Sequence, residues 1–184
     1  YDLFVEINDG RIDGDERAHE PRDEDARQDL NRKLRIVAQT ELFGGLDQKQ
    51  QRLLAFSGQW FEAKAGQVIF KAEQDADAAY LCVKGLAGLY WPEAERRILV
   101  TEVNPGRLIG DLAVIQNKKR PLNLIAIEDS LFLRIGASEL LAVIENDAAV
   151  ATSLLRSVAN HLMGAADSIR ATRAFAAEHG LDLS

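Results

Sequence analysis

The chain has 184 residues, of which 47% are hydrophobic, and its 29 acidic and 22 basic residues give a net charge of −7. A chain of this length can bury about 70% of the surface that its unfolded form exposes, so one domain can be held together by its hydrophobic core alone. The acidic balance disfavours binding to nucleic acids and to acidic membrane surfaces. The single cysteine, Cys82, excludes an internal disulfide framework and is expected in the core.

The first 35 residues contain eleven acidic and seven basic residues, so they carry −4 of the net charge of −7. Residues 3–12 have the pattern of two short strands around an Asp9-Gly10 turn. This pattern resembles the closing strand pair of an ABC-transporter ATPase domain, so we expect residues 1–12 to be a stub of a preceding domain. The polar stretch 13–29 has little to bury and is expected to be an acidic linker, disordered or loosely helical.

Two helices are expected over 30–58. Leu30, Leu34 and Val37 lie three or four residues apart and therefore share one helical face. Asp47 has the spacing of an N-cap for the second helix.

Residues 59–136 have the pattern of an antiparallel, all-β section. Short apolar or alternating runs are separated by Gly and Pro at regular intervals, which is typical of strands joined by turns. The predicted strands cover residues 68–70, 79–83, 86–91, 98–103, 122–127 and 131–135.

From residue 137 to 179 the chain is expected to be helical. A short helix over 138–145 precedes a long helix that either Asn146 or Asp147 caps and that runs toward Glu178. Apolar residues of the long helix alternate three and four apart, as in a coiled coil. Two roles fit this stripe, dimerisation with a second copy of the chain or docking on the β section. Its main residues are Leu155, Val158, Leu162 and Ile169.

Several short motifs occur in order between residues 66 and 135, among them Asn104-Pro105-Gly106, the run 110–115 and Arg120. Together they resemble the cyclic nucleotide-binding domain of protein kinase A regulatory subunits, cyclic-nucleotide-gated channels and bacterial cyclic AMP receptor proteins. The resemblance implies a mainly β fold with flanking helices. It consists of an antiparallel, jelly-roll-like β-roll with N-terminal helices and a long C-terminal helix.

In that family a phosphate-binding cassette holds the ligand, and here the cassette falls on 110–123. The resemblance implies that Gly110 begins a short helix facing the cyclic phosphate, that Arg120 adds a charge-assisted contact, and that Asp111 accepts from the ribose 2′-hydroxyl. The candidate ligand is cAMP or cGMP, and no cofactor is expected. The ligand-binding residues expected on this basis are Gly110, Asp111, Leu112, Ala113, Arg120, Pro121, Leu122 and Asn123.

Five positions depart from the family pattern. Asp111 is one methylene shorter than the family's Glu, and Pro121 has no N–H to donate to a phosphate. Leu122 is larger than the family's Ala and crowds the pocket, whereas Asn123 keeps an amide donor in place of Ser or Thr. Glu73 replaces a turn glycine, which suggests a different turn there. Together these changes predict a weaker cyclic AMP affinity, by a few powers of ten, in a pocket that is either retuned or closed.

The sequence predicts neither a catalytic nor a metal site. His19, His161 and His179 have no Cys or carboxylate at metal-ligand spacing, and no nucleophile or Gly-rich nucleotide-loop motif occurs. We therefore expect a cytoplasmic, non-enzymatic sensor domain that binds a cyclic nucleotide and signals through its C-terminal helices to an attached effector. One candidate effector is an ABC transporter, which would tether the domain to the membrane.

The alternative is a degenerate, ligand-free domain that serves as a structural or dimerisation module. Because five residues follow His179 in this sequence, we expect no helix-turn-helix DNA reader after the long helix. No nucleic-acid partner and no direct membrane insertion are expected.

Overall fold

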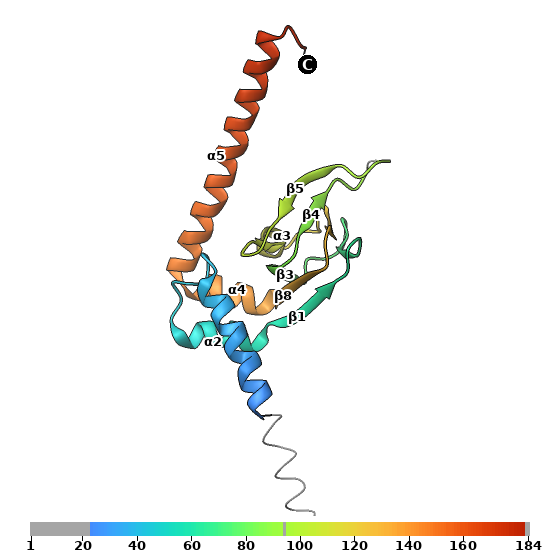
Figure 1. Ribbon diagram of the computed structural model, residues 1–184. Coiled ribbons are helices and arrows are strands. Elements are labelled where there is room, and N and C mark those ends of the chain that lie inside the picture. The colour runs from blue at the N-terminus through green and yellow to red at the C-terminus, as the bar shows by residue number, and fades with distance from the viewer. Residues whose placement is uncertain (1–22, 94, 183–184) are drawn as a thin grey trace, which may run out of the picture.

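The computed structural model describes residues 23–93 and 95–182 (Figure 1). It confirms the predicted fold class, with two antiparallel sheets, helices before them and a long helix after them. The stub expected over 1–12 and residues 13–22 of the expected linker lie outside the described residues. No helix within the described ranges is both long and apolar enough to span a membrane.

The N-terminal helix begins earlier than the sequence pattern predicts. Residues 23–29, which the pattern places in the linker, are helical, and the described helix runs from 23 to 39. This is the helical form of the two that were expected for the linker, and a tertiary contact holds its end, because the indole Nε1 of Trp60 donates to Asp29 Oδ1 at 2.6 Å and Lys33 pairs with the same carboxylate at 3.2 Å. The hydrogen bond from Trp60 is also the main cause of a lowered pKa at Asp29.

The second N-terminal helix, α2 (Gln48–Ser57), confirms the predicted N-cap. Asp47 Oδ1 accepts from the backbone N–H of Gln50 at 2.8 Å, which satisfies one of the free donors at the start of a helix. The buried face of α2 contributes Leu54 and Ala55 to the core.

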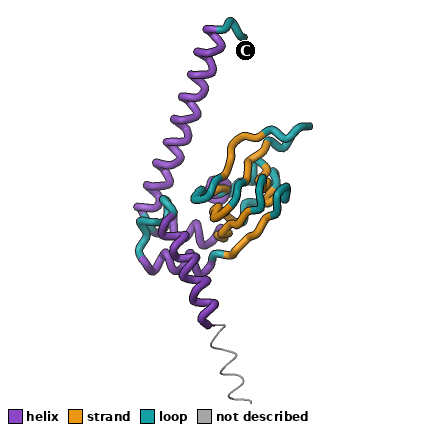
Figure 2. Tube along the Cα trace, viewed as in Figure 1, coloured by secondary structure: helices purple, strands orange, loops and turns teal. Residues whose placement is uncertain are grey.

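The β section consists of two four-stranded sheets (Figure 2). All strand pairs are antiparallel. The first sheet has the order β1-β8-β3-β6, with bounds β1 Gln59–Ala63, β3 Ala78–Lys84, β6 Leu108–Ile109 and β8 Ser130–Gly136. The second has the order β2-β7-β4-β5, with bounds β2 Val68–Phe70, β4 Ala87–Tyr90, β5 Leu99–Val103 and β7 Asn123–Ala126.

Two hydrophobic cores lie on the two faces of the first sheet. Along β3 successive side chains point to opposite faces. Leu81 therefore packs against the helices, whereas Tyr80 and Cys82 pack between the two sheets. Cys82 is 1% exposed, as predicted, and burial raises the pKa of its thiol to about 11.

The C-terminal helices are α4 (Ala137–Asn146) and α5 (Ala148–Glu178). Asp147 is the N-cap of α5, since its Oδ1 accepts from the N–H of Val150 at 3.0 Å, and Asn146 is instead the last residue of α4. Beyond its first turns α5 projects from the body of the domain (Figure 1).

The predicted stripe on α5 is therefore exposed. Leu155, Leu162 and Ile169 are 70%, 69% and 59% exposed, and Val158 is 37% exposed. This corrects one of the two roles expected for the stripe, because these side chains do not dock on the β section. α5 is a single straight helix that rises beside the β section without folding over it (Figure 2).

Candidate ligand-binding site

The cassette begins at Gly110, in the N-cap position of the short helix α3 (Asp111–Gln116). Gly110 has φ of 83°, in the left-handed region that favours glycine. A Cβ atom added here would lie 2.5 Å from Nη1 of Arg120, which is closer than real Cβ contacts allow. Two independent constraints, backbone conformation and the close approach of Arg120, therefore require glycine.

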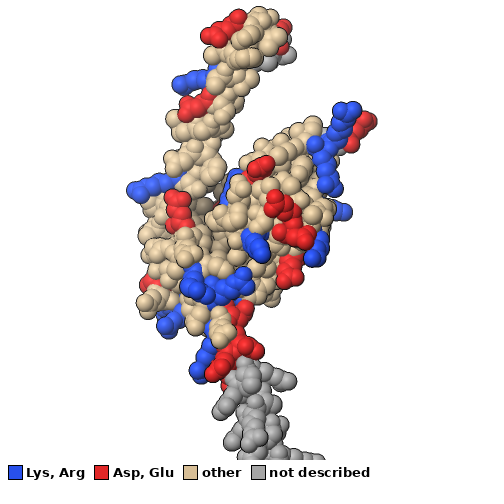
Figure 3. All heavy atoms as spheres, in the orientation of Figure 1, with Lys and Arg blue, Asp and Glu red and all other residues tan. Residues whose placement is uncertain are grey.

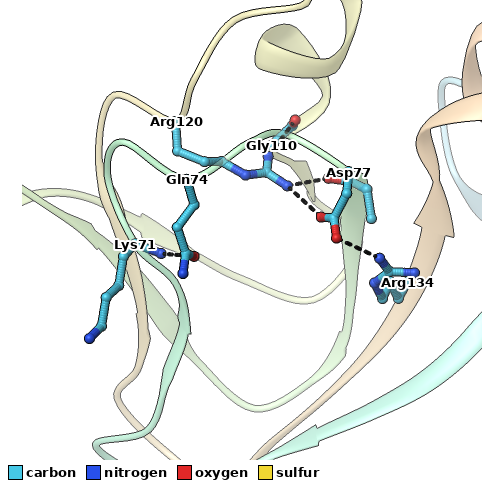
Figure 4. Close-up of polar contacts among 7 residues, drawn as sticks. Lys71, Gln74, Asp77, Gly110, Arg120 and Arg134 are labelled. Atoms are coloured by element: carbon cyan, nitrogen blue, oxygen red, sulfur yellow. Dashed lines mark hydrogen bonds and ion pairs between the residues drawn. The ribbon is translucent and has the colours of Figure 1, made fainter.

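Arg120 is the centre of the polar network in the cassette (Figure 4). Its side chain is 1% exposed, although arginine is rarely buried without partners. Nη1 donates to the carbonyl of Gly110 at 2.8 Å, and Nη2 donates to the carbonyl of Ala78 at 2.5 Å. Asp77 lies 3.8 Å from Nη2 and also pairs with Arg134 at 3.1 Å. The structure thus brings together two predicted site residues, Gly110 and Arg120, that lie ten positions apart.

The ring of Phe70 covers the Arg120 guanidinium. Its centroid lies 4.1 Å from Arg120 Cζ, within the range of a cation–π contact. Burial is the main cause of a lowered pKa at Arg120, and the nearby Tyr80 and Asp77 oppose it. The sequence motifs do not reveal Phe70 as a site residue, because its contact with Arg120 joins segments 50 positions apart.

One donor of Arg120 remains unsatisfied. Nε is buried and has no hydrogen-bond partner within the described residues. An unpaired buried donor costs about 1–3 kcal/mol, and more when it is charged. An acceptor placed beside Nε, such as an oxygen of an anionic ligand, would remove this cost.

Asp111, the first residue of α3, is partly buried. Desolvation raises the pKa of its carboxyl, whereas backbone hydrogen bonds at Asp111 and Leu112 and the positive charge of Arg107 act in the opposite direction. Arg107 is a second residue that the motif analysis does not identify. The signal that could have found it is its spacing, since a cation stands four positions before the acidic residue of the cassette.

The remaining cassette residues divide by exposure. Leu112 is 48% exposed and Pro121 is exposed, whereas Ala113 is 8% exposed and Leu122 is partly buried. Asn123 braces a neighbouring loop, because its Oδ1 accepts from the N–H of Ala72 at 2.7 Å.

Glu73 lies in the turn that faces the cassette. It has φ of 70°, in the left-handed region that favours glycine. Glu73 thus keeps the backbone conformation that a glycine would adopt at this position of the turn. Its N–H donates to the carbonyl of Arg120 at 2.8 Å, and the N–H of Arg120 donates to the carbonyl of Gln74 at 2.9 Å. These two bonds fix the backbone of Arg120 beside the turn.

Comparison with known proteins assigns this geometry to a family. The profile of the family described as "Cyclic nucleotide-binding domain" matches residues 60–147. A cyclic nucleotide-binding-like protein from Brucella abortus is 31% identical, with a TM-score of 0.53, over 61% of this chain and 97% of that one. The chain belongs to the cyclic nucleotide-binding domain family. Domains of this family are regulatory binding domains, and the cassette at 110–123 falls within the matched residues.

Two further similarities place the domain in context. The regulatory domain of Toxoplasma gondii protein kinase A, solved with cAMP, is 21% identical with a TM-score of 0.57, over 62% of this chain and 44% of that one, which shows the shared fold. Lysophospholipase nte1 from Aspergillus fumigatus is 33% identical over 76 residues. That match covers 41% of this chain and 5% of the fungal protein, so the chain spans a small part of the curated relatives that it matches.

Proposed function

We propose that this chain is a non-enzymatic sensor domain that binds a cyclic nucleotide, cAMP or cGMP, at the cassette 110–123 and signals to an attached effector. The observation that carries the proposal is that Arg120 is buried and that its Nε has no hydrogen-bond partner in the described residues. A guanidinium is buried beside the left-handed Gly110 with one N–H unpaired, which is costly in the absence of an anion. A cyclic phosphate offers charged acceptors that match this donor.

Ligand binding requires the cassette to open. Arg120 is 1% exposed under Phe70, so a phosphate reaches its guanidinium only after Phe70 or the segment around α3 moves. Binding therefore selects a second conformation in which Arg120 is accessible.

The signal would pass from α3 to the C-terminal helices. Val114 of α3 lies in the same hydrophobic core as Leu140 and Val143 of α4. Since cores are close-packed, a displacement of α3 changes the packing of α4, and α5 follows α4 after Asp147. A coupling of about 1–3 kcal/mol between ligand and helix position is sufficient for such a switch.

The effector lies in the longer protein of which this chain would be one part. The likeness to small segments of lysophospholipases favours a regulatory module within an enzyme, and the resemblance of residues 1–12 favours an ABC-transporter ATPase domain. In either case we place the domain in the cytoplasm, tethered to the membrane in the second case.

A second candidate function is a ligand-free dimerisation module. The exposed stripe of α5 favours it, because Leu155, Leu162 and Ile169 present apolar area without a partner in the described residues. The face of α5 in view also carries wide uncharged areas (Figure 3). Here the long helix makes the functional contact and the pocket stays closed.

Calorimetric titration of the chain with cAMP and with cGMP tests the first candidate. We expect measurable heat with the wild type and none with Arg120→Gln, whereas Lys118→Gln, which changes an exposed cation of the same cassette, should keep binding. Circular dichroism checks that each variant is folded. A wild type that gives no heat at millimolar nucleotide would refute binding as the function. Light scattering then tests the second candidate through the mass of the chain with and without nucleotide.

A further inference from the structure

A groove of about 730 Å³ lies between the first helix (23–39) and α2, away from the cassette. Leu30 and Leu34 line it from the first helix, and Leu53 and Phe56 line it from α2. Leu53 is 58% exposed and Phe56 is 80% exposed, so α2 presents two large apolar side chains to solvent. Neighbouring exposed apolar side chains that form a groove are typical of a surface that binds another segment.

α2 has a second regular face besides the one that it buries. Leu54 points into the helical core. The residues of α2 that line the groove include positions 49, 52, 53 and 56, which are spaced three or four apart and so share one helical face. This face combines the cations of Lys49 and Arg52 with the apolar side chains of Leu53 and Phe56. The groove is therefore a regular feature of the helix rather than a single misplaced apolar residue.

The groove carries positive charge. Lys49 and Arg52 line it, and its lining contains no acidic residue. Neither cation forms an ion pair within 4.0 Å in the described ranges. The segment that fits this surface therefore has apolar side chains for the floor and carboxylates for the two cations.

The chain itself contains such a segment. Residues 1–22, which lie outside the described residues, include seven acidic and three basic residues. Four of the five residues 3–7 are apolar, and Asp2, Glu6 and Asp9 lie within or beside them. The segment joins the first helix at residue 23, and Leu30 lies only about 10 Å further along that helix. Since residues 8–22 can span up to about 50 Å, residues 3–7 can reach the groove at the high effective concentration of a short tether.

We propose that residues 2–9 of this chain bind in the groove between the first helix and α2, with their apolar side chains on Leu53 and Phe56 and their carboxylates beside Lys49 and Arg52. This inference depends on neither the ligand nor the effector of the proposed function. The strand pair expected over 3–12 needs an apolar surface to pack on, and the groove supplies one within the chain. Because α2 shares a core with α4, the bound segment places the N-terminal end of the chain against the helices that would carry the signal.

A nitroxide attached to the full chain through Asn8→Cys tests the proposal by NMR. Cys82 is 1% exposed and burial raises the pKa of its thiol to about 11, so the reagent reacts with the introduced thiol. The measurement is the paramagnetic broadening of backbone amide signals. We expect strong broadening over α2 and little over β5, which lies at the far end of the domain from α2 (Figure 1).

Two sets of variants separate the apolar contact from the charges. Phe56→Ser should lower the ratio of docked to free chain by about tenfold, the effect of leaving one large apolar side chain uncovered. Trp91→Ser is its matched control, since Trp91 is 52% exposed just after β4 and should not affect docking. Lys49→Glu with Arg52→Glu should also abolish the broadening of α2. Adding Asp2→Lys and Glu6→Lys to that variant should restore it, because the charges are then exchanged rather than removed.

Three outcomes would overturn the proposal. Amides of α2 that are no more broadened than those of β5 would show that residues 2–9 do not bind there. Broadening of α2 that neither Phe56→Ser nor the charge reversal reduces would place the segment outside the groove. A mixture of isotope-labelled chain with nitroxide-labelled chain that lacks the isotope should show no broadening, and strong broadening of α2 in it would assign the groove to a second copy. None of these results depends on whether the chain binds a nucleotide.

Discussion

Replacing Gly110 by alanine tests whether the close approach of Arg120 stabilises the cassette. The change has two costs. A left-handed alanine costs about 1–2 kcal/mol, and the new Cβ would lie 2.5 Å from Arg120 Nη1. Arg120 must then withdraw from the carbonyl of Gly110, which forfeits a charged hydrogen bond of about 1.5–3 kcal/mol. The expected loss of unfolding free energy is therefore about 3–5 kcal/mol.

Gly66→Ala is the matched control for this experiment. Gly66 has φ of 87°, so alanine meets the same backbone strain, but nothing lies within 4 Å of the added Cβ. We expect it to cost only about 1–2 kcal/mol. Urea denaturation followed by the fluorescence of the two tryptophans measures both variants. Equal losses for the two glycines would show that Arg120 does not press on Gly110, and the geometry of the cassette argued above would be wrong.

Three further predictions concern α5 and Asp111. Asp147→Ala should destabilise the chain by about 1 kcal/mol in urea denaturation through the loss of the α5 N-cap, whereas Asn146→Ala should change stability less; the reverse order would contradict the capping assignment. If α5 joins two copies, changing Leu155 and Leu162 to serine should convert a dimer to a monomer in light scattering, and a wild-type monomer at every concentration argues against this interface. Burial in the folded state raises the pKa of Asp111 above its ordinary 3.8, so the folded state binds this proton more tightly than the unfolded state does. The contribution of Asp111 to the free energy of unfolding therefore falls as pH rises from about 3.8 through the folded pKa. Asp111→Asn should remove this pH dependence in denaturation measured over a pH series.

The sequence predicts those strands that consist of a continuous apolar or alternating run of residues. The run 68–70 is β2, and the run 79–83 lies within β3, because alternating or apolar residues bounded by turns report a pleated strand directly. β6 has only two residues and offers no pattern to detect. β1 is missing from the predicted runs, since its residues do not alternate cleanly between buried and exposed.

The features of the helices that the sequence does not predict depend on tertiary structure. The contact between Trp60 and Asp29 joins residues 31 positions apart and cannot be seen in the local sequence, so the polar composition of 23–29 alone suggests a linker. The stripe of α5 has the spacing of a packed helix, but spacing does not say what covers it. The direction in which α5 leaves the domain is set at Asp147, where the backbone is extended between α4 and α5.

In the candidate site too, the local spacing is predicted and the contacts between distant segments are not. The spacing of Gly110 and Arg120 comes from the family motif, and the structure places them in direct contact. Their roles toward a ligand stay predictions. Phe70 covers Arg120 from a segment 50 positions away, a contact that the spacing of the motifs does not show. The sequence therefore predicts where the cassette lies but not whether it is open.

The burial of Arg120 sets how strongly a nucleotide would have to bind. To bring Nε to a phosphate, the cassette must open and the guanidinium must move relative to Phe70, which disturbs its bonds to the carbonyls of Gly110 and Ala78. If opening costs about 3 kcal/mol, roughly two charged hydrogen bonds partly replaced by water, fewer than about 1% of molecules are open. The apparent affinity is then reduced by the same factor of about 100, before any effect of Pro121 or Leu122. A closed cassette therefore predicts weak, saturable binding that variants of Phe70 strengthen, whereas a dead pocket predicts binding that no change at Phe70 restores.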